Sequence, residues 1–233
     1  MPTINASKYG HMSTSAQGSG AFNTARTAVA ATGTVSNQPT GTQVPVRYNI
    51  GFSSKGDTAT LNRAWWAFNV TTYQSGYTIT DLQLQFDPTT NTSTNFPIIV
   101  LASTAQGNAD TNLTSFDWNN FDSGTTYTTT STNNYWPDTN SVSTLDLNST
   151  AISAFSTGYL KVCIQWVFDY NGIGSLVTAN AQAYQNYNYV PRITFSAAAS
   201  GWTGGIINTV AVESNNQINT VGFSNIDSVN TVT

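Results

Sequence analysis

The chain has 233 residues, of which only 8% are charged, and its 7 basic and 11 acidic residues give a net charge of −4. An ordinary soluble domain carries about 25% charged residues. In this chain Thr, Asn, Ser and Gln must therefore supply most of the polar groups that interact with water at the surface. The Lys and Arg residues are scattered singly, whereas nucleic-acid binding needs clustered cations. No apolar run reaches the roughly 18 residues of a membrane span, and residues 1–12 lack the apolar core of a secretory signal. We therefore expect neither nucleic acid nor a membrane as a partner.

The N-terminal half predicts strands separated by polar loops. A short extended piece is expected at residues 3–7, and residues 22–29 predict a second strand. Alternating apolar and polar residues predict further strands at residues 46–52, 60–70 and 77–88, the last of which Pro88 ends because proline cannot donate to a sheet. Residues 97–102 are apolar at every position but the first, which indicates a strand covered on both faces.

The C-terminal half contains the longest alternation, at residues 158–169. Leu160, Val162, Ile164, Trp166 and Phe168 fall on one face, and Tyr159, Lys161, Cys163, Gln165 and Asp169 fall on the other. This pattern predicts a central strand with one face on the core and the other toward water or a second layer. Residues 103–141 are too long for a bare loop, so we expect one or two short irregular strands within them.

Three further elements complete the predicted fold. A short strand is expected at Leu145 and Leu147, and a last one in residues 184–195, where Ile193 and Phe195 face inward. Residues 148–157 are the only predicted helix, capped by Asn148.

Strands with long polar loops and no amphipathic helices between them predict an all-β fold. We expect a two-sheet antiparallel sandwich of jelly-roll type, with one short helix and an extended C-terminal arm. The expected division is a sandwich at residues 1–196, a linker at 197–206 and the arm at 207–233.

Several segments together resemble a known family. They are RAWWAFNV, ITDLQLQFD, FDWNNF, LDLNSTAISAF followed by GYLKVCIQWVFD, and YVPRITF. This order is similar to the DNRLRE-type sandwich, which is related to carbohydrate-binding modules. The opening KYGHM and AFNTAR also resemble the version carried by bacteriophage virion proteins. The likeness covers residues 3–196 and implies a jelly-roll domain of a phage particle.

The arm contains a repeat of the form I/V-N-T-V, whose copies begin at residues 207, 218 and 229, at intervals of 11. Such a short unit cannot bury its apolar face alone, so it must lie on its own sandwich, stack on copies of itself or dock on another protein. A disordered polar tail is the alternative. The arm is similar to C-terminal repeats of phage particle proteins, which serve assembly or attachment. We interpret it as an interaction arm that uses strand addition, with Ile207, Val210, Ile218, Val221, Ile226, Val229 and Val232 as its apolar residues.

The residues needed for catalysis are sparse. Glycosidases usually need two carboxylates. The one glutamate, Glu213, lies in the arm. Asp117 and Asp122 lie in a segment where Asp normally caps backbone N–H groups. Cys163 and His11 are each the only residue of their kind, and the sequence does not show whether they meet. We therefore expect no enzyme.

Two kinds of ligand are considered at the sequence level. Oxygen-rich loops at residues 117–122, or at Asp169 with Asn171, suit calcium, but their spacing matches no defined calcium loop and we expect no cofactor. Trp65, Tyr187 and Tyr189 could form a platform on which a sugar stacks. The alternative is that residues 103–141 cover Trp65 and that the tyrosines brace a loop.

The functional expectation is a non-enzymatic phage particle component, such as a capsid decoration or head-fibre-like protein. It would assemble in the host cytoplasm, contact other virion proteins and form a homo-oligomer, with a trimer favoured. The alternative is a glycan-binding or receptor-binding module of a tail fibre.

Overall fold

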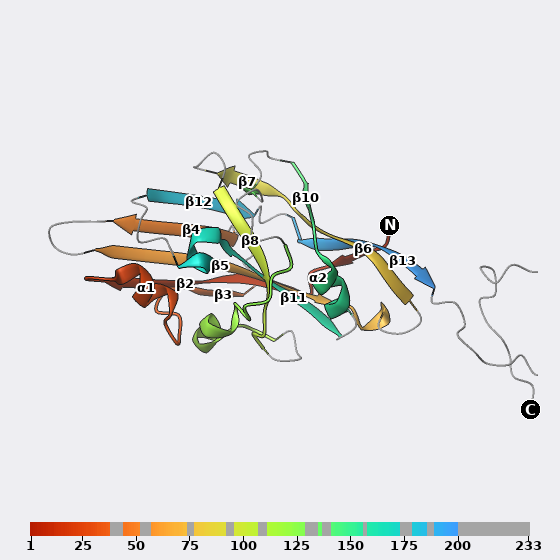
Figure 1. Cartoon of the computed structure of the whole chain (residues 1–233), viewed down its shortest axis with the longest axis horizontal. Coiled ribbons are helices and arrows are strands. Elements are labelled where there is room, and N and C mark those ends of the chain that lie inside the picture. Colours follow the sequence, from red (N-terminus) through yellow and green to blue (C-terminus); the bar gives the residue numbers. More distant parts are fainter. Residues whose placement is uncertain are drawn as a thin grey trace, which may run out of the picture.

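The structure is a computed structural model that describes residues 1–37, 44–51, 57–73, 77–91, 96–106, 111–128, 135–136, 141–155, 158–172, 179–185 and 189–199. In chain order the elements, with η for a 3-10 helix, are β1 (Thr3–Asn5), β2 (Lys8–Gln17), α1 (Ala21–Arg26), β3 (Val35–Asn37), β4 (Val44–Gly51), β5 (Thr58–Asn69), η1 (Thr71–Tyr73), β6 (Tyr77–Phe86), β7 (Pro88–Asn91), β8 (Phe96–Ala102), η2 (Ser115–Asn120), β9 (Tyr135–Trp136), β10 (Ser143–Asp146), α2 (Ser149–Ala154), β11 (Tyr159–Trp166), α3 (Val167–Asn171), β12 (Ala179–Gln185) and β13 (Arg192–Ala199). Strands dominate and all pair antiparallel, in two sheets (Figure 1).

The smaller sheet has the strand order β1-β13-β6-β10. Its apolar residues alternate with polar ones, so one face is buried and the other is polar. Leu82, Leu84 and Phe86 of β6 and Ile193 and Phe195 of β13 are all buried on the inner face. The first and last described strands lie side by side here, since Thr3 pairs with Thr194.

The larger sheet is organised around β5, its longest strand. The order runs β7-β12-β4-β5-β11-β8-β9, and β2 pairs with both β3 and β5. One edge of β5 is occupied by β2. The other edge is shared, because β4 pairs with Thr58 to Asn62 and β11 pairs with Ala64 to Asn69. Arg63 therefore stands at the point where β4 and β11 diverge.

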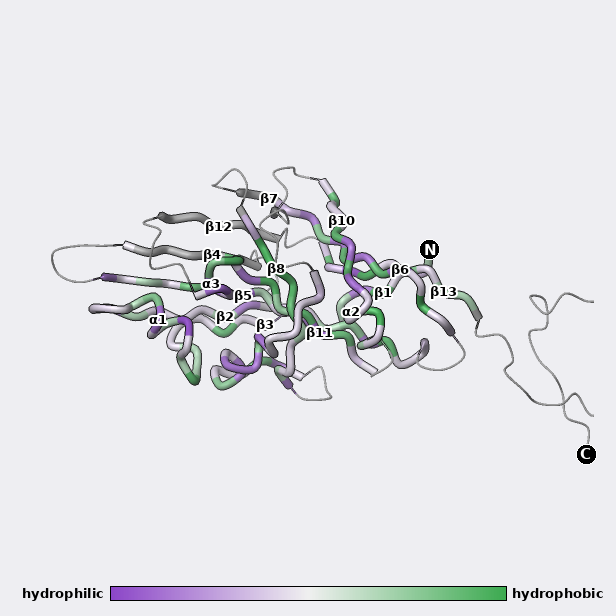
Figure 2. The backbone as a smooth tube through the Cα atoms, viewed as in Figure 1, coloured by the Kyte–Doolittle hydropathy of each residue, from purple (hydrophilic) through white to green (hydrophobic). Residues whose placement is uncertain are grey.

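Aromatic side chains join the two sheets. The ring of Trp66 on β5 lies 5.7 Å from that of Phe86 on β6, and Phe86 lies 4.8 Å from Trp136 of β9. At the other end, Phe195 lies 4.8 Å from Tyr73 and 4.9 Å from Phe155. Much of β8 and β11 is strongly apolar (Figure 2). The inner faces of both sheets thus belong to one core.

The opposite face of the larger sheet is also covered. Helix α1 packs on β2 and β5 through Ala21, Phe22 and Ala25, which are buried. Parts of residues 103–106 and 111–128 lie on the same face, where Trp118 of η2 lies over Arg63. Both faces of β11 are consequently buried, although its alternation predicted one face toward water or a second layer. The face of β11 that carries Cys163 therefore packs against a second layer and does not face water.

Most predicted strands and the helix cap are confirmed. Strands occur as expected at β1, β4, β5, β6, β8 and β10, and β9 is a short strand within residues 103–141. Asn148 caps α2, accepting hydrogen bonds from the backbone N–H groups of Thr150 and Ala151. The last strand begins at Arg192, and it continues to Ala199, three residues into the predicted 197–206 linker.

Four predictions about the elements are wrong. Residues 22–29 are not a strand, because Ala21, Phe22 and Ala25 have the i, i+1, i+4 spacing of a helix face and form α1. The ten-residue strand β2 was not predicted. The central strand ends at Trp166, so Phe168 and Asp169 lie in α3. Residues 148–157 therefore do not hold the only helix.

Candidate functional site

Trp65 lies on the covered face of the larger sheet. Its side chain is only 1% exposed, so in this structure its ring has no open face on which a sugar could stack. The structure supports the alternative in which the ring of Trp65 is covered, and not a sugar platform at this residue. Its neighbour Trp66 points the other way, into the contact with Phe86. The cover includes the buried residues Trp118 and Phe121, which belong to the polar segment 103–141 that this alternative named.

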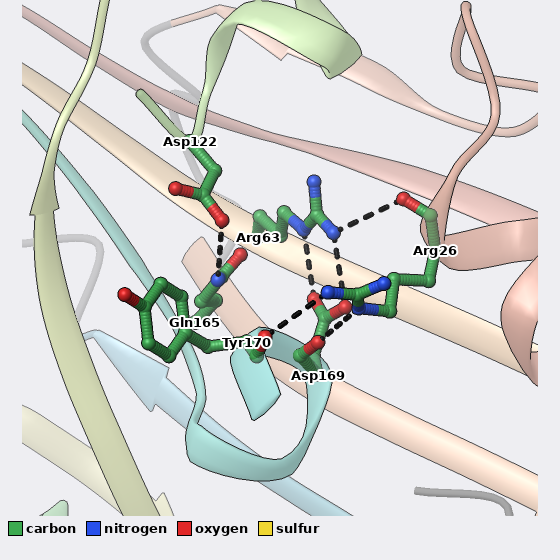
Figure 3. A network of polar contacts seen from close by, with 6 residues as sticks. All are labelled: Arg26, Arg63, Asp122, Gln165, Asp169 and Tyr170. Atoms are coloured by element: carbon green, nitrogen blue, oxygen red, sulfur yellow. Dashed lines mark hydrogen bonds and ion pairs between the residues drawn. The ribbon is translucent and has the colours of Figure 1, made fainter. Parts of the chain in front are cut away.

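A buried ion pair lies on the same face. Arg63 donates to Asp169 from Nε at 2.8 Å and from Nη2 at 2.9 Å, and both side chains are at least 95% buried (Figure 3). The guanidinium group also lies 4.1 Å from the centre of the Trp118 ring, which adds a cation–π contact. The neighbouring Asp169 carboxylate offsets the effect of burial and raises the pKa of Arg63. Arg63 and Asp169 therefore form a bidentate ion pair that is shielded from water.

Arg26 extends this contact into a network that ties three segments together. It donates to the backbone carbonyls of Asp169 at 2.5 Å and Tyr170 at 3.1 Å, while its own carbonyl accepts from Arg63 at 3.3 Å. The network thus joins α1, β5 and α3. Close by, Gln165 donates to Asp122 at 3.3 Å. Residues separated by 106 positions form the ion pair, so sequence reasoning had no local pattern from which to predict it.

Cys163 and His11 face opposite sides of the larger sheet. Cys163 pairs with Trp65 in the strand register, whereas His11 pairs with the adjacent residue Ala64, and successive residues of a strand point to opposite faces. Burial raises the pKa of the Cys163 thiol well above its usual range, which keeps it protonated. The two side chains therefore do not form a nucleophile–base pair.

Asp117 and Asp122, two of the carboxylates that suggested calcium, accept hydrogen bonds from neighbouring backbone N–H groups. Asp117 accepts hydrogen bonds from the backbone N–H of Thr114 at 2.7 Å and from its hydroxyl at 2.9 Å, and the bond from the backbone N–H is one half of the capping box of η2. Asp122 accepts from the backbone N–H of Gly124 at 2.7 Å, as well as from Gln165. Within the described part of the chain, no three His, Cys, Asp or Glu side chains gather as a metal would require.

A polar surface remains on the outer face of the smaller sheet, where the side chains are exposed or half-buried except for Thr194, which is buried. Its side chains form two rows across the four strands, given by the register: Asn5, Arg192, Gln85 and Thr144 in one, and Thr3, Thr194, Gln83 and Asp146 in the other. Arg192 donates to Gln85 at 2.8 Å, and Gln83 donates to Asp146 at 2.8 Å. We call these eight residues the polar face. Its amide, hydroxyl and guanidinium groups are those that bind neutral hydroxyl-rich ligands.

Tyr189 lies beside the polar face. Its ring is 5.4 Å from the guanidinium carbon of Arg192, a cation–π contact. Burial raises the pKa of the Tyr189 phenol, and the nearby Arg192 opposes that change. Trp65 and Tyr189 do not form one platform, because Trp65 faces away from the smaller sheet. Tyr187 and the arm residues, from Ile207 to Val232, lie outside the described residues.

Among the helices of the described residues, none is long and apolar enough to cross a membrane. No protein-family model matches the chain, and a search of curated proteins finds no match to its sequence.

Removing Asp169 should be costly because it leaves Arg63 buried without its anion. We expect Asp169→Ala to lower the free energy of unfolding by about 3–5 kcal/mol, measured by urea titration. The double variant Arg63→Met with Asp169→Leu should recover most of that loss. The matched control is Asp146→Ala on the exposed polar face, where the loss should stay below about 1 kcal/mol. Equal losses at the two aspartates would contradict a special role for the buried pair.

Stability should also depend on His11. Burial lowers the pKa of His11 from 6.5 to about 4, and its Nδ1 has no hydrogen-bond partner among the described residues. The unfolded chain therefore binds this proton at higher pH than the folded chain does. The resulting stability is present above about pH 6.5 and is lost as the pH falls toward 4, up to about 3 kcal/mol.

The measurement is urea unfolding near pH 7 and near pH 4.5, for the natural chain and for His11→Gln. Carboxylates titrate in both proteins, so the difference between their pH dependences isolates His11. The variant should lose less stability on acidification. If both proteins lose the same amount, His11 is not the titrating group.

Proposed function

We propose that this protein is a non-enzymatic structural component of a bacteriophage particle. In this proposal it is a capsid decoration or head-fibre-like protein, displayed on the particle surface and attached or oligomerised through its C-terminal arm. The observation that carries the proposal is the repeat at residues 207–210, 218–221 and 229–232, which follows the last strand of a β domain. Three copies of one apolar-ended unit are hard to explain as drift, and they suit repeated docking.

The proposed architecture of the domain is a jelly-roll sandwich. Two antiparallel sheets with a shared aromatic core support it, as does the pairing of β1 with β13. This pairing brings the start of the chain beside the strand from which the arm departs. The arm follows β13 in the chain, after residues 200–206.

The surface chemistry fits display outside a cell. Charged residues make up 8% of the chain, and the single thiol, Cys163, is fully buried. A thiol-free surface of hydroxyl and amide groups has little to lose to oxidation. The charged residues Arg63 and Asp169 form an ion pair inside the domain and do not lie on its surface.

The first test compares the native mass of the full chain with that of a chain ending at Ala199. The proposal expects a closed oligomer, with a trimer favoured, for the full chain and a monomer for the shortened one. A full-length variant with Ile207, Ile218 and Val229 changed to Ser should behave as the shortened chain does, because apolar burial would be lost at each repeat. A second readout is sedimentation with purified phage particles, which the natural chain should show and this variant should lose. A chain that never sediments with particles would contradict the particle role.

The polar face supports a second candidate, a glycan-binding or receptor-binding module of a tail fibre. Arg192 lies within the polar face and Tyr189 beside it, so hydrogen-bonding groups and an aromatic ring occur together. Sugars bind to such combinations through hydroxyl contacts and stacking. The uncharged character of most of this face indicates a neutral rather than a strongly acidic glycan.

This second candidate is tested on an array of bacterial surface polysaccharides. Tyr189→Ala and Arg192→Ala should each weaken binding about two- to tenfold, since an aromatic contact or a hydrogen bond contributes about 0.5–1.5 kcal/mol. Tyr77→Ala is the matched control, because Tyr77 is an exposed tyrosine at the other end of β6. No binding by the natural chain, or equal losses in all three variants, would remove this candidate.

A further inference from the structure

Strand β13 has one edge that is only partly used. On one side it pairs with β6 along its whole length, from Arg192 to Ala199. On the other side it pairs with β1 only from Arg192 to Thr194, and the carbonyl of Pro2 then accepts from the backbone N–H of Phe195 at 3.2 Å. Among the residues the structure describes, none pairs with this side from Ser196 to Ala199. We call these four residues the open edge.

The open edge lacks two of the usual protections of an edge strand, charged side chains and prolines. Proteins block exposed edges with charged side chains, prolines or bulges, because unpaired N–H and C=O groups attract another strand. Edge strand β7 begins with Pro88, and edge strand β10 ends in Asp146. The open edge has neither a charge nor a proline, and its single irregularity is a register shift between Ser196 and Ala197. Its small side chains let a second backbone approach.

The arm supplies segments that match this edge. Each repeat is four residues long, as the open edge is, and consists of β-branched residues around one Asn, a composition that favours strands. A short segment of this kind can bind an edge strand through backbone hydrogen bonds, and this binding depends little on side-chain charge. Consecutive repeats are separated by seven residues, which can span about 25 Å when extended.

Counting edges and repeats favours pairing between molecules. The described residues of one chain contain one open edge as defined above, whereas the sequence contains three repeats, so at least two repeats cannot bind to the open edge of their own chain. Other copies of the same chain carry the same open edge. The first repeat follows β13 closely, whereas the second, at residues 218–221, has the reach to leave its own domain.

We propose that the open edge of β13 is the acceptor site for the arm, and that residues 218–221 of a second copy add to it as a fifth strand of the smaller sheet. This inference rests on the proposed assembly role of the arm, and it identifies the surface that the arm binds. It predicts an exchange in which each copy both donates a repeat and accepts one.

The test uses two differently tagged full-length chains, one with Ala198→Cys and the other with Asn219→Cys, mixed and mildly oxidised. Adjacent strands bring Cα atoms within the roughly 4.4–6.8 Å that a disulfide needs. The native Cys163 is fully buried and its thiol stays protonated, so it does not compete. We expect a cross-linked dimer carrying both tags, at least about tenfold more abundant than with the control pair, because docking raises the local concentration.

The control pair is Thr150→Cys with Asn219→Cys, since Thr150 is exposed on α2, away from the open edge. Equal cross-linking of the two pairs would overturn the proposal. So would a chain carrying both Ala198→Cys and Asn219→Cys that cross-links only within itself, because the donor would then be the same molecule. Thermal unfolding of each single variant verifies that the fold is retained.

Hydrogen exchange gives an independent measurement on the natural chain. Amides of Ser196 to Ala199 that point outward should become more protected as protein concentration rises, and Ile218→Pro should abolish that change. Protection that is independent of concentration would contradict pairing between copies. Sedimentation with phage particles is measured separately, so a failure of the particle role and a failure of this acceptor site can be told apart.

Discussion

The buried pair of Arg63 and Asp169 holds together parts of the fold that the sheets alone do not connect. Arg63 stands where β4 and β11 part along β5, so pairing is interrupted on this edge while β2 pairs with the other edge. Its guanidinium group binds Asp169 of α3, lies over Trp118 and reaches the carbonyl of Arg26. Because an unpaired charge inside a protein is costly, α1, α3 and η2 must all be in place for the pair to be satisfied.

The layers that pack on the two faces of the larger sheet place Cys163 and His11 in the interior. Cys163 and His11 are buried on opposite faces of one sheet, and Asp117 and Asp122 are occupied in holding loops. The described surface offers a different chemistry, which includes the amides and hydroxyls of the polar face and the open edge of β13. Such groups recognise other molecules by hydrogen bonding, and this agrees with the binding and assembly roles that we propose.

The two proposed roles use different parts of the smaller sheet. The polar face lies across its strands, with Arg192 at the centre, whereas the open edge lies along the end of β13. A domain could therefore be held by its edge while the polar face stays free. The separation also explains why variants at Tyr189 and at Ala198 report on different functions.

Local pattern predicted many of the strands, while contacts distant in sequence decided what the strands face. The alternation in β6 and the cap at Asn148 were predictable, because strand periodicity and helix capping depend on near neighbours. The helical spacing of Ala21, Phe22 and Ala25 was present too, although it was taken for a strand. The burial of Trp65 and Lys161 and the pairing of Arg63 with Asp169 needed the tertiary structure. Alternation shows that a strand has two faces, but only the packing of α1 and residues 103–128 determines that neither face of β11 meets water.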